Sequence, residues 1–320
     1  MVVPAEIRRN ATLVAIAGAV FGVLALVVVA IVGGLARPLT ESELRIVGPS
    51  IDVEVWVLRV GAVAGAAIAL WLAFRAWVRP AARVAWAAAA FFAVSWLPLH
   101  YGTAVRPALF AALGCVAAGG YATRWLVERD RQALGGGAAA VVVVAVLHPP
   151  SAVAVVVGLS LVAVVWARRQ SPPLPAALVG GLVVGLVAGQ AWTPGGFAQR
   201  LAPDNLLGLS PVGAALMMLA LAAPVVVALL QHRWPHRRNA TVVSVVLFVA
   251  LLVPAVLRGD WSTAAVLPAY AVLTVAVGAG LLEAWQLVRR AGSVWASVAL
   301  AATMVAFTAW QVVLAAGSLA

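Results

Sequence analysis

The chain has 320 residues, of which 65% are hydrophobic and only 10% are charged, and its mean hydropathy is +1.08. This balance excludes a water-soluble globular protein, and no polar interval is long enough to fold as a separate domain. The net charge of +11 comes from arginine alone, since the chain has no lysine. The placement of these arginines, described below, explains the charge better than nucleic-acid binding does.

Hydrophobic segments recur along the whole chain, and eleven of them are predicted to cross a membrane. Each must be helical, because lipid offers no other partner to the backbone polar groups. The first follows Arg8 and Arg9 and is too long for a cleaved signal peptide, so it is interpreted as a signal anchor. The predicted spans are 13–35, 54–74, 84–98, 107–127, 134–147, 150–167, 174–191, 209–230, 240–257, 263–287 and 293–316.

The polar intervals between these spans alternate in charge. Arginines gather in every second interval, namely at 8–9, 75–83, 124–131, 168–169, 233–238 and 289–290. Positively charged loops translocate poorly, so we expect these intervals and the N-terminus inside the cell and the C-terminus outside. The predicted fold class is therefore all-α, one polytopic membrane domain over residues 1–320. The Ala- and Val-rich composition without lysine points to a bacterial plasma membrane, whose anionic lipids would meet the basic face.

The spans 134–147 and 150–167 are short for a bilayer, and His148, Pro149 and Pro150 lie between them. Two prolines end a helix, so a turn is predicted here rather than one continuous helix. The pair either turns below the outer surface or lies behind other helices. His148 would then line a cavity and bind a ligand, or else cap the turn.

The first outward loop carries acids that could perform catalysis. Asp52 and Glu54 lie just before the second span, where a falling dielectric tends to raise the pKa of a carboxyl. Such a group suits a general base that takes a proton from a sugar hydroxyl. The alternative is an ordinary solvated loop.

Two further outward loops hold arginines against the charge rule. His100, Tyr101 and Arg106 lie together in the second loop, and Arg200 lies in the loop at 192–208, which could fold over an outward cavity. A guanidinium fork matches phosphate oxygens, which favours a phosphate clamp. The alternative is an arginine that reaches lipid headgroups, with Tyr101 as an interfacial anchor.

The remaining motifs concern packing and metal binding. No metal site is predicted, because His100 and His148 are the only outward histidines, although a divalent cation is left open. Most tryptophans lie near span ends and are interpreted as interface anchors. Small residues are interpreted as helix-packing faces, among them Gly61, Gly65, Gly180, Gly181 and Gly185.

Residues 101–211 resemble a known family. The segments YGTAVRP, VVAVLHPPSAVAVVVGLSLVAVVWARR, LPAALVGGLVVGLVAGQAW and GGFAQRL are similar to the middle of GT-C membrane glycosyltransferases, especially bacterial mannosyltransferase-like proteins. The resemblance implies a GT-C-like fold with an outward active site. The first loop of this chain departs from the family, because it is short and its acids are split, and the protein could be a relative that has lost catalysis.

The resemblance also implies a reaction. A sugar, mannose or another, would pass from a polyprenyl-phosphate donor to a glycan or lipid-linked acceptor. Asp52 or Glu54 would be the catalytic acid residue, Arg106 or Arg200 would hold the donor phosphate, and His148 would line the pocket. The alternatives are a transporter or flippase for a lipid-linked or anionic solute, and a non-catalytic subunit of a cell-envelope assembly.

Overall fold

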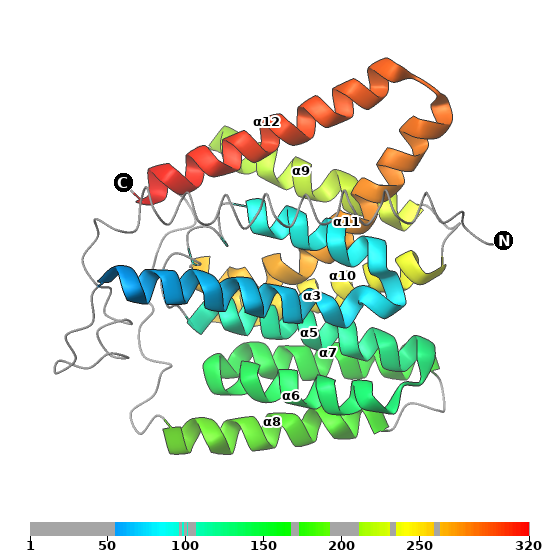
Figure 1. Cartoon of the computed structure of the whole chain (residues 1–320). Helices are drawn as coiled ribbons and strands as arrows, with labels where there is room; N and C mark the ends of the chain where they lie inside the picture. Colours follow the sequence, from blue (N-terminus) through cyan, green and yellow to red (C-terminus); the bar gives the residue numbers. More distant parts are fainter. Residues whose placement is uncertain are drawn as a thin grey trace.

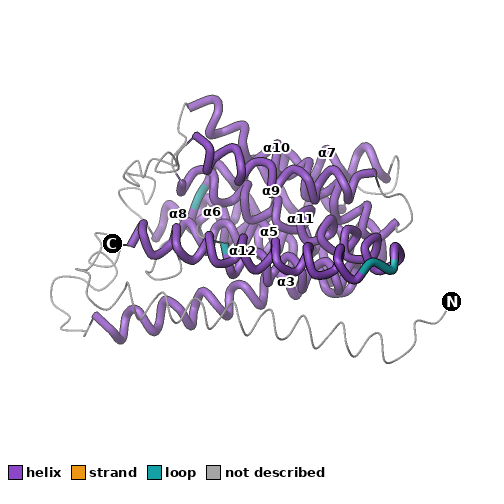
Figure 2. Tube along the Cα trace, turned by 90° about the horizontal axis from the view of Figure 1, so that it is seen from above, coloured by secondary structure: helices purple, strands orange, loops and turns teal. Residues whose placement is uncertain are grey.

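A computed structural model describes residues 55–95, 98, 101, 107–167, 173–192, 211–230, 235–258 and 263–319, and every regular element in these ranges is a helix. The predicted first span and first outward loop lie outside the described residues. The helices pack side by side in one bundle, as Figures 1 and 2 show from two directions. Their bounds are α3 Val55–Val94, α5 Pro107–Glu128, α6 Arg131–Leu147, α7 Pro149–Ala167, α8 Pro173–Trp192, α9 Pro211–Leu230, α10 Pro235–Arg258, α11 Thr263–Ala291 and α12 Val294–Leu319.

Five segments within these helices are long and apolar enough to cross a membrane, which identifies a membrane protein. They are Val60–Val78, Pro107–Glu128, Arg238–Leu257, Ala265–Ala291 and Val294–Leu314. The other helices are apolar but shorter. All the predicted spans within the described ranges therefore coincide with helices, while helix length alone supports five crossings.

The helix α3 is two helices joined at a sharp kink. Ala81, which follows Pro80, has non-helical backbone angles of φ −157° and ψ 58°. The ring centroids of Phe74 and Phe92 lie only 6.1 Å apart. In one straight helix these residues would be about 27 Å apart at about 1.5 Å per residue. The chain therefore folds back on itself at the kink, as the two predicted spans with an arginine-rich interval between them require (Figure 1).

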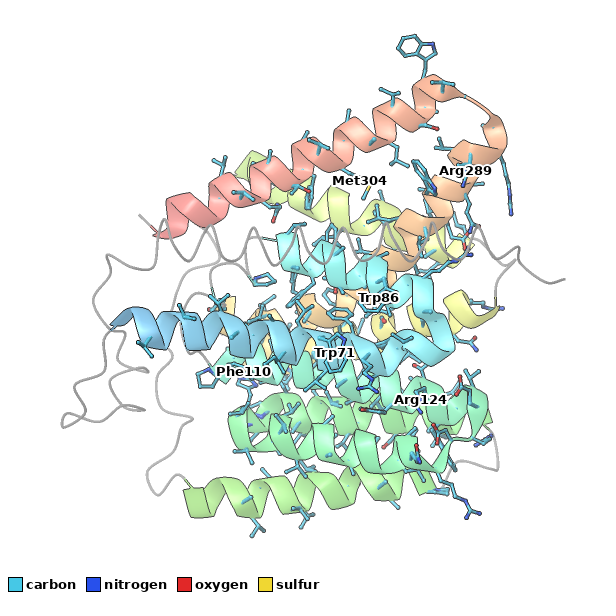
Figure 3. The ribbon with its side chains drawn as sticks, viewed as in Figure 1. Trp71, Trp86, Phe110, Arg124, Arg289 and Met304 are labelled. Atoms are coloured by element: carbon cyan, nitrogen blue, oxygen red, sulfur yellow. The ribbon has the colours of Figure 1, made fainter. Side chains whose placement is uncertain are left out.

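Helix directions follow from the contacts between helices. Gly114 of α5 faces Val144 of α6, because a methyl group added to Gly114 would lie 2.6 Å from Val144 Cγ2. Gly136 of α6 likewise faces Tyr121 of α5, because a methyl group added to Gly136 would lie 2.6 Å from the Tyr121 ring. Residue numbers rise on α5 as they fall on α6, so these helices are antiparallel. Turns joining α5 to α6 and α11 to α12 lie at one end of the bundle, where Arg124 and Arg289 also lie (Figures 1 and 3).

The outermost helix α8 packs on α6 through glycines. A methyl group on Gly181 would lie 2.5 Å from the Ala138 carbonyl oxygen, and one on Gly185 would lie 2.6 Å from Ala145 Cβ. Without side chains at these positions the two backbones can approach closely, which is how helices gain contact energy in lipid. The prediction for Gly181 and Gly185 is confirmed.

Other predicted packing glycines behave differently. A methyl group on Gly61 or Gly180 would meet nothing within 4 Å, and one on Gly65 would meet only the Phe110 ring at 3.7 Å. The packing prediction is therefore wrong for Gly61 and Gly180. Both lie on faces of helices that no other described helix covers, and a small side chain there serves no contact.

The helix α11 runs through the centre of the bundle, and every residue from 271 to 280 is buried. It approaches α9 very closely at one point, because a methyl group on Gly280 would overlap the backbone carbonyl of Pro224. Trp77 of α3 is completely buried nearby in the core, and its indole Nε1 donates to the Val116 carbonyl at 2.8 Å. Trp77 is therefore not an interface anchor, because its ring fills the core and its one donor is paired inside the protein.

The α5–α6 turn is held by charge and capping. Arg129 adopts the left-handed conformation at φ 55°, which ends α5, and its N–H donates to the Trp125 carbonyl at 3.0 Å. Asp130 caps α6 by accepting from the Gln132 N–H at 2.9 Å, and its other oxygen pairs with Arg124. One carboxylate thus ties both helices together at the arginine-rich end.

Candidate functional site

The predicted break at residues 148–150 is present and lies against two other helices. α6 ends at Leu147, His148 adopts φ −152° and ψ 80°, and α7 starts at Pro149. The two prolines occupy the first turn of α7, where their missing N–H groups cost nothing. The N–H of His148 still donates to the Val144 carbonyl at 2.6 Å. The turn prediction is confirmed.

The imidazole of His148 contacts a serine in the same turn. His148 Nδ1 lies 2.7 Å from Ser151 Oγ, and Ser151 is only 3% exposed. The amides of Ser151 and Ala152 both donate to the His148 carbonyl, at 3.1 and 3.3 Å. Backbone and side chain of His148 are therefore both fixed, and the tautomer of the ring decides whether the hydroxyl donates or accepts.

A small pocket of about 20 Å³, with room for about one water-sized group, opens beside this pair between α7, α10 and α11. Apart from His148 and Ser151 its lining is apolar, formed by Pro150, Leu251, Pro254, Ala255 and Ala265. Pro254 lies inside α10 and has no N–H for the carbonyl one turn earlier, so that carbonyl lacks its usual helical hydrogen bond. An imidazole and a hydroxyl among apolar walls can hydrogen-bond one small polar group, such as a water molecule or a single hydroxyl of a larger ligand. The lining contains no carboxylate, so these residues alone supply no acidic base of the kind predicted.

The depth of the pocket follows from helix register. Gly114 of α5 faces Val144 of α6. Because the two helices are antiparallel, Phe110, one turn before Gly114, lies level with His148, which comes one turn after Val144. Phe110 also contacts the position of Gly65 on α3. Since α3 begins at Val55, its start projects about 15 Å past the level of His148, at about 1.5 Å per residue. Figure 1 shows this projection at the blue end of α3. The pocket therefore lies below the rim of the bundle.

The predicted site residues are only partly within the described ranges. His148 lines the pocket, and Tyr101 is 1% exposed within the main hydrophobic core. Tyr101 is thus enclosed by protein rather than placed in an interfacial belt. Asp52, Glu54, His100, Arg106 and Arg200 lie outside the described residues. The predicted meeting of a carboxylate with a guanidinium stays a prediction.

Sequence reasoning missed Ser151. A serine three positions after His148, in the first turn of a helix opened by prolines, is a capping pattern and could have suggested the contact. It also missed the pairing of Asp130 with Arg124, although a carboxylate at a helix start close to several arginines is its usual signal. Among the described residues, no three His, Cys, Asp or Glu side chains gather as metal ligands would.

Comparison with known proteins adds no relative. The chain matches no protein-family model, and it shows no significant similarity to curated proteins or to solved structures.

Proposed function

We propose that this protein is a GT-C-like glycosyltransferase of the bacterial plasma membrane. It takes a sugar from a polyprenyl-phosphate donor and passes it to a glycan or lipid-linked acceptor at the outer face. The proposal includes eleven spans, with the N-terminus and the arginine-rich intervals inside and the C-terminus outside. The support from sequence is the charge alternation and the resemblance over residues 101–211.

The observation that carries the proposal is the His148–Ser151 pair in a pocket between apolar helices. Ionisable side chains within a membrane bundle are costly and usually serve a function. Broken helices at membrane depth usually line a cavity. Both features meet at this position, and the two polar groups can hydrogen-bond a single hydroxyl of a larger ligand.

The reaction needs two further groups. The oxygen of the acceptor hydroxyl attacks the anomeric carbon, the bond from that carbon to the phosphate oxygen breaks, and the electron pair leaves with polyprenyl phosphate. Asp52 or Glu54 takes the hydroxyl proton, and Arg106 or Arg200 stabilises the charge on the departing phosphate. Because α3 starts about 15 Å past the level of His148, the proposal assigns the carboxylate to the rim and His148 to the floor.

The test is release of polyprenyl phosphate by purified full-length protein given a polyprenyl-phosphate sugar and candidate acceptors. We expect Asp52→Asn or Glu54→Gln to abolish turnover, and Arg106→Ala to reduce it by about 100-fold or more. Ser151→Ala should raise KM, whereas Ser160→Ala, on the same helix but away from the pocket lining, should not. Full activity in both carboxylate variants and in Arg106→Ala would remove the proposal.

A non-catalytic subunit is the second candidate, favoured because the described residues that line the pocket include no carboxylate. It predicts that the protein binds a lipid-linked sugar without turnover. Binding that weakens in Ser151→Ala but is unaffected in Asp52→Asn and Glu54→Gln would select this role over catalysis.

A further inference from the structure

The last helix, α12, is the least enclosed part of the described bundle. Val294 to Leu314 is apolar enough to span a membrane, yet almost none of it is buried. All positions from 301 to 306 are exposed, and six consecutive residues cover every side of a helix. In Figure 1 the first half of α12 stands away from the other helices.

Among the described helices, contacts with α12 beyond its first turn come from its second half. Phe307 stacks on Phe91 of α3, with ring centroids 5.4 Å apart, and Trp310 meets Phe307 edge-on at 5.9 Å. Gln311 is completely buried. The first half of α12 is therefore held away from the other described helices, by the aromatic contacts at one end and by the turn from α11 at the other.

An open hollow of about 170 Å³ lies at that turn, where α11 ends and α12 begins. Arg289, Ser293 and Ser297 supply its polar lining, and Val288, Gly292 and Val294 complete it. Arg289 and Arg290 are both exposed, but only Arg289 lines the hollow. The Ser297 hydroxyl donates to the Ser293 carbonyl at 3.2 Å, and the Ser293 hydroxyl accepts from the Ala296 N–H at 3.2 Å. The Arg289 guanidinium and the O–H of Ser293 are thus the donors that suit phosphate oxygens.

Apolar surface continues from the hollow along both helices. Trp295 is 83% exposed and Val305 is 70% exposed on α12, while Trp285 and Leu287 are exposed at the end of α11. Met304 lies on the side of α12 that faces α9 (Figure 3). A hollow with an arginine, next to apolar surface that no described helix covers, fits a phosphate headgroup and its acyl chains.

We propose that the hollow at the α11–α12 turn binds the phosphate of an anionic phospholipid, whose acyl chains lie along the uncovered first half of α12. Charge complementarity with Arg289 selects a lipid over an apolar partner. Exposure on every side of residues 301–306 also favours lipid, because a partner helix would cover one stripe and lipid chains surround the whole helix.

The test is native mass spectrometry of the full chain with phosphatidylglycerol, compared with phosphatidylcholine. We expect preferential retention of phosphatidylglycerol and a loss of affinity of about fivefold in Arg289→Gln, because one arginine contributes about that factor at an anionic surface. Arg290→Gln is the matched control, with the same change of charge outside the hollow, and should lose less than twofold.

A competition experiment distinguishes binding of a lipid from binding of a free phosphate-bearing anion. Glycerol phosphate, which lacks acyl chains, should not displace phosphatidylglycerol at millimolar concentration. Displacement by glycerol phosphate, or equal losses in Arg289→Gln and Arg290→Gln, would overturn the proposal. A dimer whose formation shields α12 and excludes phosphatidylglycerol would also overturn it, since a second copy would then cover the helix.

Discussion

The contact of α8 with α6 gives the sharpest test of the fold, because two adjacent glycines differ completely in their surroundings. A methyl group on Gly181 would lie 2.5 Å from the Ala138 oxygen and 3.0 Å from Ala138 Cα, whereas one on Gly180 would meet nothing within 4 Å. The obstacle at Gly181 is backbone, which cannot rotate away. We therefore expect Gly181→Ala to destabilise the protein and Gly180→Ala to leave it unchanged.

The magnitude follows from the shift that the alanine forces. An ordinary contact needs about 3.5–4.0 Å, so α8 must move outward by about 1 Å, and such a gap forfeits a quarter to a half of each contact energy along the interface. Overpacking of this kind costs about 1–3 kcal/mol. Gly185→Ala should cost about the same, since its methyl group would lie 2.6 Å from Ala145 Cβ and 2.8 Å from the Val142 oxygen. One outward shift relieves both overlaps, so the double variant should cost less than the sum.

The assay is equilibrium unfolding of the reconstituted protein by sodium dodecyl sulfate, followed by tryptophan fluorescence. The refuting result is clear: equal stability of Gly181→Ala and Gly180→Ala would mean that this face of α8 does not pack on α6. A loss in Gly180→Ala alone would mean that the helix is rotated from the position described.

Three other outcomes can be measured in the same assay. Gly280→Ala should cost about 1–3 kcal/mol, because its methyl group would overlap a backbone carbonyl of α9, while Gly61→Ala, in open space, should be neutral; equal stabilities would contradict the close approach. Trp77→Phe should cost more than about 1 kcal/mol, because it removes a buried hydrogen bond and leaves a void where the indole ring packed, and an unchanged midpoint would contradict the buried position of Trp77. Asp130→Ala should cost about 1–2 kcal/mol, because it removes both the cap of α6 and the ion pair with Arg124. Asp130→Asn should cost less, because asparagine still caps α6. Identical costs of the two variants would assign the whole effect to the ion pair.

Some features of the candidate site could be predicted from the sequence, and others depend on how distant segments pack. The diproline after His148 predicted the turn, since proline restricts the backbone wherever it occurs. The helices that would close the pocket could not be predicted, because Leu251, Pro254 and Ala265 come from distant parts of the chain. The contact of His148 with Ser151 is local, and the spacing of three residues at a helix start could have predicted it.

The sequence by itself determined that the chain is helical, where most helices start and end, and which intervals are basic. These properties follow from hydropathy, proline and charge, each of which acts locally. Only the tertiary structure decided which face of each helix is covered: Gly181 but not Gly180, Trp77 in the core, and α12 largely bare. In water, apolar periodicity marks the buried face of a helix. In lipid both faces are apolar, so shape alone selects the contacts, and shape is a property of two surfaces that meet only in the folded protein.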